Sequence, residues 1–164
     1  PTSSNGINRL KAENVWKRLS NKNNYPLQIF RLAGIYSNEL NILKRLQLGK
    51  AQIVDKKNHF FSRIHVDDIA NILYKSINSF KKNEIYNICD DMPASQVEVA
   101  AYGDKLLKLE LPNPIKLDTA SEMLQNFYKD SKKVDNKKMK SFFNYNLKYP
   151  TYEEGLKNIF NKNI

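Results

Sequence analysis

Two side chains with complementary chemistry, Arg63 and His65, stand two residues apart in the segment Phe61-Ser-Arg-Ile-His-Val-Asp-Asp-Ile-Ala70. They alternate with the apolar residues Ile64 and Val66, so in a strand both would point to the same face. A guanidinium binds phosphate or carboxylate groups, and an imidazole can exchange a proton near neutral pH. The pair therefore predicts a strand face that contacts a polar substrate. The alternative for His65 is a partly buried ring that hydrogen-bonds a neighbouring strand or aspartate.

The elements around this pair would place it at the edge of a sheet. Residues 60–66 are typical of a strand, and the apolar period that follows predicts a helix for which Asp67 is the candidate N-cap. A nearly continuous apolar run over residues 27–35 predicts a parallel strand that is covered on both faces. It leads into the loop Ala33-Gly34-Ile35-Tyr36, which would emerge at the carboxyl end of the strand, where such sheets place ligands.

The rest of the chain alternates between helical and strand patterns. Helices are expected over residues 6–19, 38–48, 134–143 and 152–160 and after Ser95, and a further strand over 84–89. This alternation predicts an α/β fold with mostly parallel strands. Because the strands are too few for a complete doubly wound sheet, half of the sheet is expected to lie outside this chain.

Composition limits the class of protein. The 164 residues make one domain or a large part of one, and the net charge of +10 comes from 22 Lys and 5 Arg spread over most of the chain. No basic stripe interleaved with aromatic residues is present, which argues against a nucleic-acid partner. There is no N-terminal Met, no signal-like stretch and no apolar run near 18 residues, so we expect a soluble cytoplasmic fragment or processed chain without a membrane segment. The single cysteine, Cys89, suits a reducing compartment, and His59, in a polar turn, is expected at the surface.

Five segments resemble, in the right order, motifs of the extended short-chain dehydrogenases/reductases, the family that includes nucleotide-sugar epimerases. They are Pro26–Tyr36, Phe61–Ala70, Ile85–Pro93, Val134–Lys140 and Tyr149–Leu156. The resemblance covers nearly the whole chain and is most similar to the atypical bacterial epimerase-like members. It implies the C-terminal half of such a protein, which in a complete chain would bind NAD or NADP.

The resemblance also implies a changed catalytic pair. In this family a Tyr acts as general acid/base, and a Lys one helical turn later lowers the pKa of the Tyr and holds the ribose. Asn5 and Arg9 occupy these positions here. Asn5 has no titratable proton, whereas Arg9 keeps the charge and could reach a ribose or phosphate, or could simply be a solvated helix residue. The Gly-x-x-Gly-x-x-Gly turn that cradles the dinucleotide is absent, so this chain alone is expected to hold no cofactor.

The remaining site residues follow from the same resemblance. The substrate-binding candidates are Ala33, Gly34, Tyr36, Arg63 and His65; the cofactor-binding candidates are Arg9, Leu32 and Ala33; and no metal site is expected. Gly34 stands where sugar-nucleotide enzymes commonly place an Asn that holds the substrate. This difference argues against the same recognition of uridine-diphosphate sugars.

These observations predict one partial domain over residues 1–164, the C-terminal part of a Rossmann-like parallel sheet with a small substrate lobe. Segments 1–36 and 62–108 would complete the Rossmann sheet, and segments 37–61 and 109–164 would form the lobe. The first hypothesis is a fragment of an NAD(P)-dependent epimerase/dehydratase-like or oxidoreductase protein whose substrate is small and polar, with nucleotide-sugars as candidates. The second is a catalytically silent nucleotide-sensing or regulatory module. A homodimer through the helix over residues 6–19 is a candidate assembly.

Overall fold

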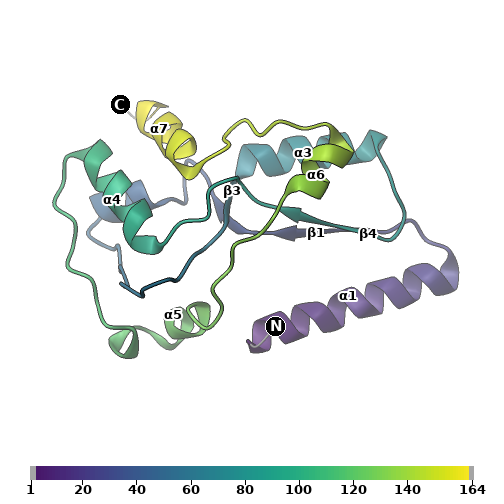
Figure 1. Cartoon of the computed structure of the whole chain (residues 1–164), viewed down its shortest axis with the longest axis horizontal. Helices are drawn as coiled ribbons and strands as arrows, with labels where there is room; N and C mark the ends of the chain where they lie inside the picture. The colour runs from purple at the N-terminus through teal and green to yellow at the C-terminus, as the bar shows by residue number, and fades with distance from the viewer. Residues whose placement is uncertain (1–2, 163–164) are drawn as a thin grey trace.

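A computed structural model describes residues 3–162, so residues 1, 2, 163 and 164 of the predicted terminal segments lie outside the described residues. Helices and strands alternate along the chain, as Figure 1 shows. The elements are α1 (Ser4–Asn23), β1 (Gln28–Leu32), β2 (Gly34–Tyr36), α2 (Ile42–Gln47), β3 (Arg63–His65), α3 (Val66–Asn78), β4 (Glu84–Ile88), α4 (Gln96–Leu107), a 3-10 helix η1 (Leu117–Thr119), α5 (Glu122–Phe127), α6 (Lys137–Phe143) and α7 (Tyr152–Lys162).

The strands form two parallel pairs, β1 with β4 and β2 with β3. The predicted α/β class with parallel strands is confirmed. The apolar run over residues 27–35, predicted as one strand, is two strands that meet at Ala33. The Ala33 N–H donates to the carbonyl of Ile88, the last residue of β4, and the next N–H, of Gly34, donates to the carbonyl of Ser62, just before β3. The chain therefore changes its strand partner at this point.

Helices cover the β1/β4 pair on two sides. In Figure 1, α3 and α6 lie on one side of these strands and α1 on the other. Ile64, Ile72, Tyr86 and Met139 form part of the buried core between the strands, α3 and α6. A second core, on the other side of the β2/β3 pair, joins α2, α4 and α7, with Leu156 among its buried residues.

The packing cuts across the predicted division of the chain. Helix α4, within segment 62–108, packs on α2 and α7, whereas α6, within segment 109–164, packs on β4 and α3. The division into Rossmann-completing and lobe segments stays a prediction.

Helix α1 begins after Ser3, whose side chain accepts from the N–H of Gly6. Four apolar side chains along α1 are between 38% and 43% exposed: Ile7, Leu10, Val15 and Leu19. The outer edge of β1 also has no strand partner among residues 3–162. Parallel sheets normally bury both faces, so the β1 edge and α1 present surface that a larger sheet would cover.

Several element boundaries differ from the prediction. The Asn41 side chain accepts from the N–H of Lys44, so α2 begins at Ile42 rather than at residue 38. Helix α6 begins at Lys137 rather than at residue 134, and η1 and α5 were not predicted. Within residues 3–162, no helix is both long enough and apolar enough to cross a membrane.

Candidate functional site

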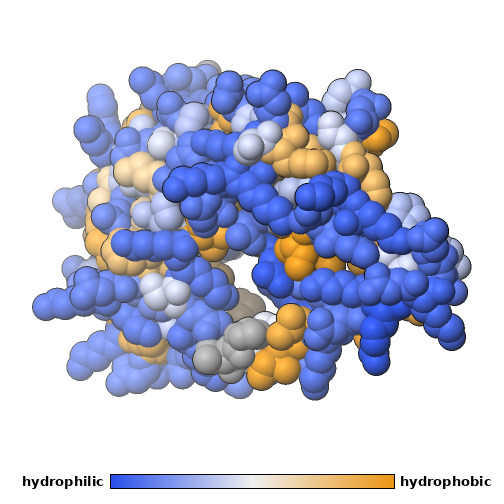
Figure 2. Space-filling view, turned by 45° about the vertical axis from the view of Figure 1, so that its right-hand side comes forward, coloured by the Kyte–Doolittle hydropathy of each residue, from blue (hydrophilic) through white to orange (hydrophobic). Residues whose placement is uncertain are grey.

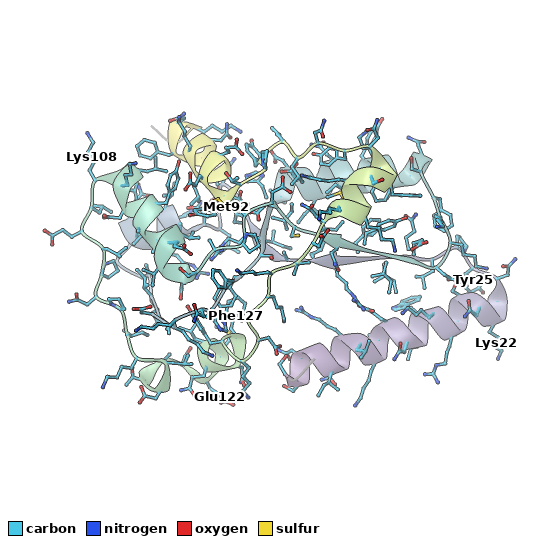
Figure 3. The ribbon with its side chains drawn as sticks, in the orientation of Figure 1. Lys22, Tyr25, Met92, Lys108, Glu122 and Phe127 are labelled. Atoms are coloured by element: carbon cyan, nitrogen blue, oxygen red, sulfur yellow. The ribbon has the colours of Figure 1, made fainter. Side chains whose placement is uncertain are left out.

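A pocket of about 220 Å³ lies just beyond the carboxyl ends of β1 and β4. This position follows from the chain path. Gly34 begins β2, with one residue between it and the end of β1, and the Arg63 carbonyl accepts from the N–H of Asp90, which lies just beyond β4, at 2.7 Å. Gly34, Tyr36 and Arg63 line the pocket together with residues of α2 and α5. Figure 3 shows Phe127, which lines the pocket from α5, on the inner side of its helix, and Glu122 on the outer side.

Arg63 supplies a buried positive charge to this pocket. Its Nη1 donates to the carbonyls of Phe61 and Ala94, both at 3.0 Å, and its guanidinium lies 5.9 Å from the ring centre of Tyr152. Within residues 3–162, Nε and Nη2 have no hydrogen-bond acceptor. Burial lowers the pKa of Arg63, and the nearby Asp90 opposes that change. The side chain is thus fixed by backbone carbonyls and keeps donors for a ligand, a suitable arrangement for binding an anionic group.

Tyr36 forms one wall of the pocket but does not resemble a catalytic base. Its ring is buried against Gly155 of α7, and its hydroxyl has no hydrogen-bond partner among the described residues. Burial, and then the charge of Asp90, raises the pKa of the phenol far above its usual value. A phenol in this state cannot replace the missing Tyr of the Tyr-x-x-x-Lys pair as a general base near neutral pH.

His65 lies behind the pocket rather than in its wall. It is 2% exposed, its ring is 5.1 Å from that of Tyr36 and 4.3 Å from that of Tyr149 between ring centres, and its Nδ1 accepts from the N–H of Asp67 at 3.0 Å. His65 is therefore the N-cap of α3, the role predicted for Asp67, which instead pairs with Lys148. Burial lowers the pKa of His65. The geometry of His65 is that of the alternative prediction, a buried ring that is hydrogen-bonded to a nearby aspartate, here through the backbone N–H of Asp67.

Asp90, which the sequence did not single out, is the most unusual group near the pocket. Its side chain is 1% exposed, its Oδ1 accepts from the N–H of Met92 at 3.2 Å, and its Oδ2 has no partner among residues 3–162. Burial raises the pKa of Asp90 to about 7, against the opposing effects of the Met92 N–H and Arg63. A carboxyl that titrates near neutral pH beside a charged pocket is typical of functional sites.

The residues predicted to hold a cofactor are not brought together by this chain. Asn5 and Arg9 are exposed on α1, Leu32 is 40% exposed at the end of β1, and the N–H of Ala33 is already bonded to Ile88. Arg9 is an exposed cation and Leu32 is exposed apolar surface, but these residues provide no set of free backbone N–H groups that could bind a pyrophosphate. The described residues therefore do not fit a dinucleotide by themselves.

The prediction that His59 lies at the surface is wrong, because its side chain is 4% exposed. Its ring stacks on Tyr128 at 4.9 Å between ring centres, and burial lowers its pKa. Among residues 3–162, no cluster of three or more His, Cys, Asp or Glu side chains could hold a metal ion.

Comparison with solved structures establishes what this architecture is. The chain superposes over 99% of its length, with a TM-score of 0.89 and 36% identity, on a functionally unknown conserved protein from Silicibacter pomeroyi. It superposes over 98%, with a TM-score of 0.77 and 18% identity, on dTDP-glucose 4,6-dehydratase from Bacillus anthracis in complex with NAD. A third neighbour is UDP-glucose 4-epimerase from Thermotoga maritima with UDP-glucose, with 96% of the chain covered, a TM-score of 0.76 and 17% identity.

The chain has the fold of NAD-dependent epimerases and dehydratases. It spans 57%, 52% and 53% of the three neighbouring chains, in the order given above, which is about half the length of each. No protein-family model matches the chain, and a search of curated proteins finds no match. The likeness to epimerases and dehydratases is therefore a likeness of three-dimensional fold.

Proposed function

We propose that this chain is the C-terminal, substrate-binding half of an NAD(P)-dependent epimerase/dehydratase-type enzyme. Its substrate is small and polar and carries an anionic group, and nucleotide-sugars are the leading class. The observation that supports this proposal is the fixed Arg63 guanidinium in a pocket beyond the carboxyl ends of β1 and β4, where open α/β sheets bind their ligands. The unpaired edge of β1 agrees with a second half that supplies further strands and the cofactor site.

Within this proposal the pocket binds and orients the substrate. Arg63 would hold a phosphate or carboxylate through Nε and Nη2, and the Tyr36 ring and Phe127 would exclude water from the apolar part of the ligand. A Cβ added at Gly34 would lie 3.4 Å from the carbonyl oxygen of Ser62, which is ordinary contact, so the pocket has room at the position where sugar-nucleotide relatives commonly carry Asn. Ala33 and His65 would act from behind the pocket by fixing Gly34 and Tyr36.

A second candidate function is ligand binding without turnover, as in a nucleotide-sensing or regulatory module. Two observations favour it. Asn5 has no proton to transfer, and Tyr36, the phenol in the pocket, has a pKa raised by burial. The homodimer through residues 6–19 and the cytoplasmic location stay predictions; the exposed Trp16 and Leu19 of α1 are surface that such a dimer could bury.

Calorimetric titration of the chain with UDP and with UDP-glucose tests the binding proposal. Arg63→Met should weaken binding about 10- to 100-fold, since a hydrogen bond to a charged group contributes about 1.5–3 kcal/mol. Arg31→Met is the matched control, because Arg31 is exposed and bonds Glu13 of α1, outside the pocket. Equal affinity for both variants would overturn the assignment of Arg63.

Turnover separates the two candidate functions. A longer version that includes the upstream half should be assayed with UDP-glucose and NAD. Binding with conversion supports the enzyme, and binding without conversion supports the silent module.

A further inference from the structure

We propose that Asp90 is a proton-linked counter-charge to Arg63, so that the pocket takes up an anion together with a proton. This inference rests on the proposed function of Arg63 as the anion-binding group. It goes further because it assigns to Asp90, which the proposed function does not use, control over the charge of the pocket. Asp90 is thus a positioning residue, not a group that touches the ligand.

Of the two carboxylate oxygens of Asp90, one is hydrogen-bonded and the other has no hydrogen-bond partner among the described residues. The backbone N–H of Asp90 donates to the Arg63 carbonyl at 2.7 Å, which fixes the two residues next to each other. Oδ1 is bonded to the N–H of Met92, and Oδ2 is buried with no partner among residues 3–162. An ionised carboxylate with an unpartnered buried oxygen is costly unless a cation compensates it.

The positive charge of Arg63 opposes the rise in the pKa of Asp90, but the two side chains do not form a direct ion pair within 4 Å in the described part of the chain. The guanidinium Nη1 is bonded to the carbonyls of Phe61 and Ala94 instead. The Nζ of Lys140 in α6 donates to both carboxylate oxygens of Asp91, the residue after Asp90. The attraction between Arg63 and Asp90 therefore acts through space, and an anion that binds Nε and Nη2 would compete with it.

The other titratable groups around Asp90 do not supply a second cation. Tyr36 of β2 is a buried neutral phenol, Cys89 is a buried thiol whose pKa burial raises to about 12, and Asp91 is an anion already paired with Lys140. Tyr152 of α7 and Tyr128 face Arg63 as neutral rings. Burial raises the pKa of Asp90 to about 7, so both charge states are populated near neutral pH.

Anion binding and protonation must then favour each other. An anion at Arg63 repels ionised Asp90, and it leaves that carboxylate without its compensating charge. Because coupling between two binding events is reciprocal, the bound anion raises the proton affinity of Asp90, and protonated Asp90 raises the affinity for the anion. If only the protonated form binds, the apparent affinity falls about tenfold between pH 6 and pH 8, in proportion to the protonated fraction.

Sulfate is the probe, because it stays a dianion over this pH range and adds no titration of its own. Isothermal titration of the chain with sulfate at pH 6, 7 and 8 should show about tenfold weaker binding at pH 8 than at pH 6. Asp90→Asn should bind sulfate with nearly the same affinity at all three values. Asp91→Asn is the matched control, since it removes one negative charge from the adjacent position and should keep the pH dependence.

The outcomes separate this inference from the proposed function. Sulfate binding that is no tighter in the wild-type chain than in Arg63→Met overturns both. Binding that depends on Arg63 but has no pH dependence, or has one that survives in Asp90→Asn, overturns the inference alone. Should Asp90→Asn fail to fold by circular dichroism, the carboxyl carbon of Asp90 can be titrated by NMR in the wild-type chain. Saturating sulfate should raise its midpoint, and an unchanged midpoint would contradict the proposal.

Discussion

Replacing Gly155 by Ala should destabilise the protein through one contact with the pocket wall. A Cβ at Gly155 would lie 2.0 Å from the hydroxyl oxygen of Tyr36, 2.7 Å from its Cζ and 2.8 Å from its Cε2. The Tyr36 ring is 7% exposed and packs edge-on against the His65 ring, at 5.1 Å between ring centres. Overpacking of a core contributes about 1–3 kcal/mol of destabilisation. Ala in a helix interior returns about 1 kcal/mol, so the net loss should be at most about 2 kcal/mol.

Urea unfolding followed by far-UV circular dichroism would measure this difference, with Gly103→Ala as the matched control. Gly103 is also a buried helical glycine, but a Cβ there would meet only the ends of the Leu46, Leu43 and Ile42 side chains, at 3.0, 3.2 and 3.4 Å. These flexible groups can move, so Gly103→Ala should be neutral or stabilising.

A double-mutant cycle would identify Tyr36 as the cause of the Gly155 effect. Tyr36→Phe removes the hydroxyl that overlaps most but leaves two ring carbons closer than 3.0 Å, so it should relieve part of the destabilisation. A coupling of about 0.5–1 kcal/mol is expected, since contacting residues are rarely additive. If Gly155→Ala is as stable as Gly103→Ala, or if the two changes are additive, the packing of α7 against Tyr36 is not as described.

Two further predictions concern buried carboxylates. Asp68 accepts hydrogen bonds from the Tyr145 hydroxyl and from the N–H groups of Lys148 and Tyr149. Asp68→Asn should therefore lower the free energy of unfolding by about 2–4 kcal/mol, measured by urea titration at pH 7. A loss below about 0.5 kcal/mol would contradict this prediction. Burial raises the pKa of Asp90 from 3.8 to about 7, so the folded state binds this proton more tightly than the unfolded chain. The contribution of Asp90 to the free energy of unfolding is complete below pH 4 and is lost as the pH rises to about 7. The loss is at most about 4 kcal/mol. Asp90→Asn should flatten this part of the pH profile of thermal unfolding.

Local chemistry explains what could be predicted from the sequence. The helix cap at Ser95, with its side chain accepting from the Glu98 N–H and the Glu98 side chain accepting from the Ser95 N–H, depends on residues three positions apart. The placement of Gly34 and Arg63 in one pocket depends on a general rule about the ends of parallel strands. Both are properties of short segments, and both could be read from the residues alone.

Other features could not be predicted from the sequence, because they depend on burial by segments that are distant along the chain. His65 is covered by Tyr149, a residue from another part of the chain, so the alternation that placed His65 and Arg63 on one face could not tell which of them reaches the pocket. The residues around His59 are typical of an exposed polar turn. The ring that buries His59 belongs to Tyr128, which is far away in the sequence. Asp90 reads as an ordinary turn aspartate after a strand, and only its 1% exposure reveals its importance.

The contact between Gly155 and Tyr36 also has a consequence for the order in which the protein can fold during synthesis. The ribosome releases β2 long before α7, and β1 must likewise wait for β4, its parallel partner. Until α7 emerges, the Tyr36 ring has no support from that side and remains exposed on the nascent chain. Structures built from contacts between distant segments form slowly and expose apolar surface meanwhile. The pocket should therefore be completed only after α7 has been synthesised, and until then the growing chain should be a good substrate for chaperones.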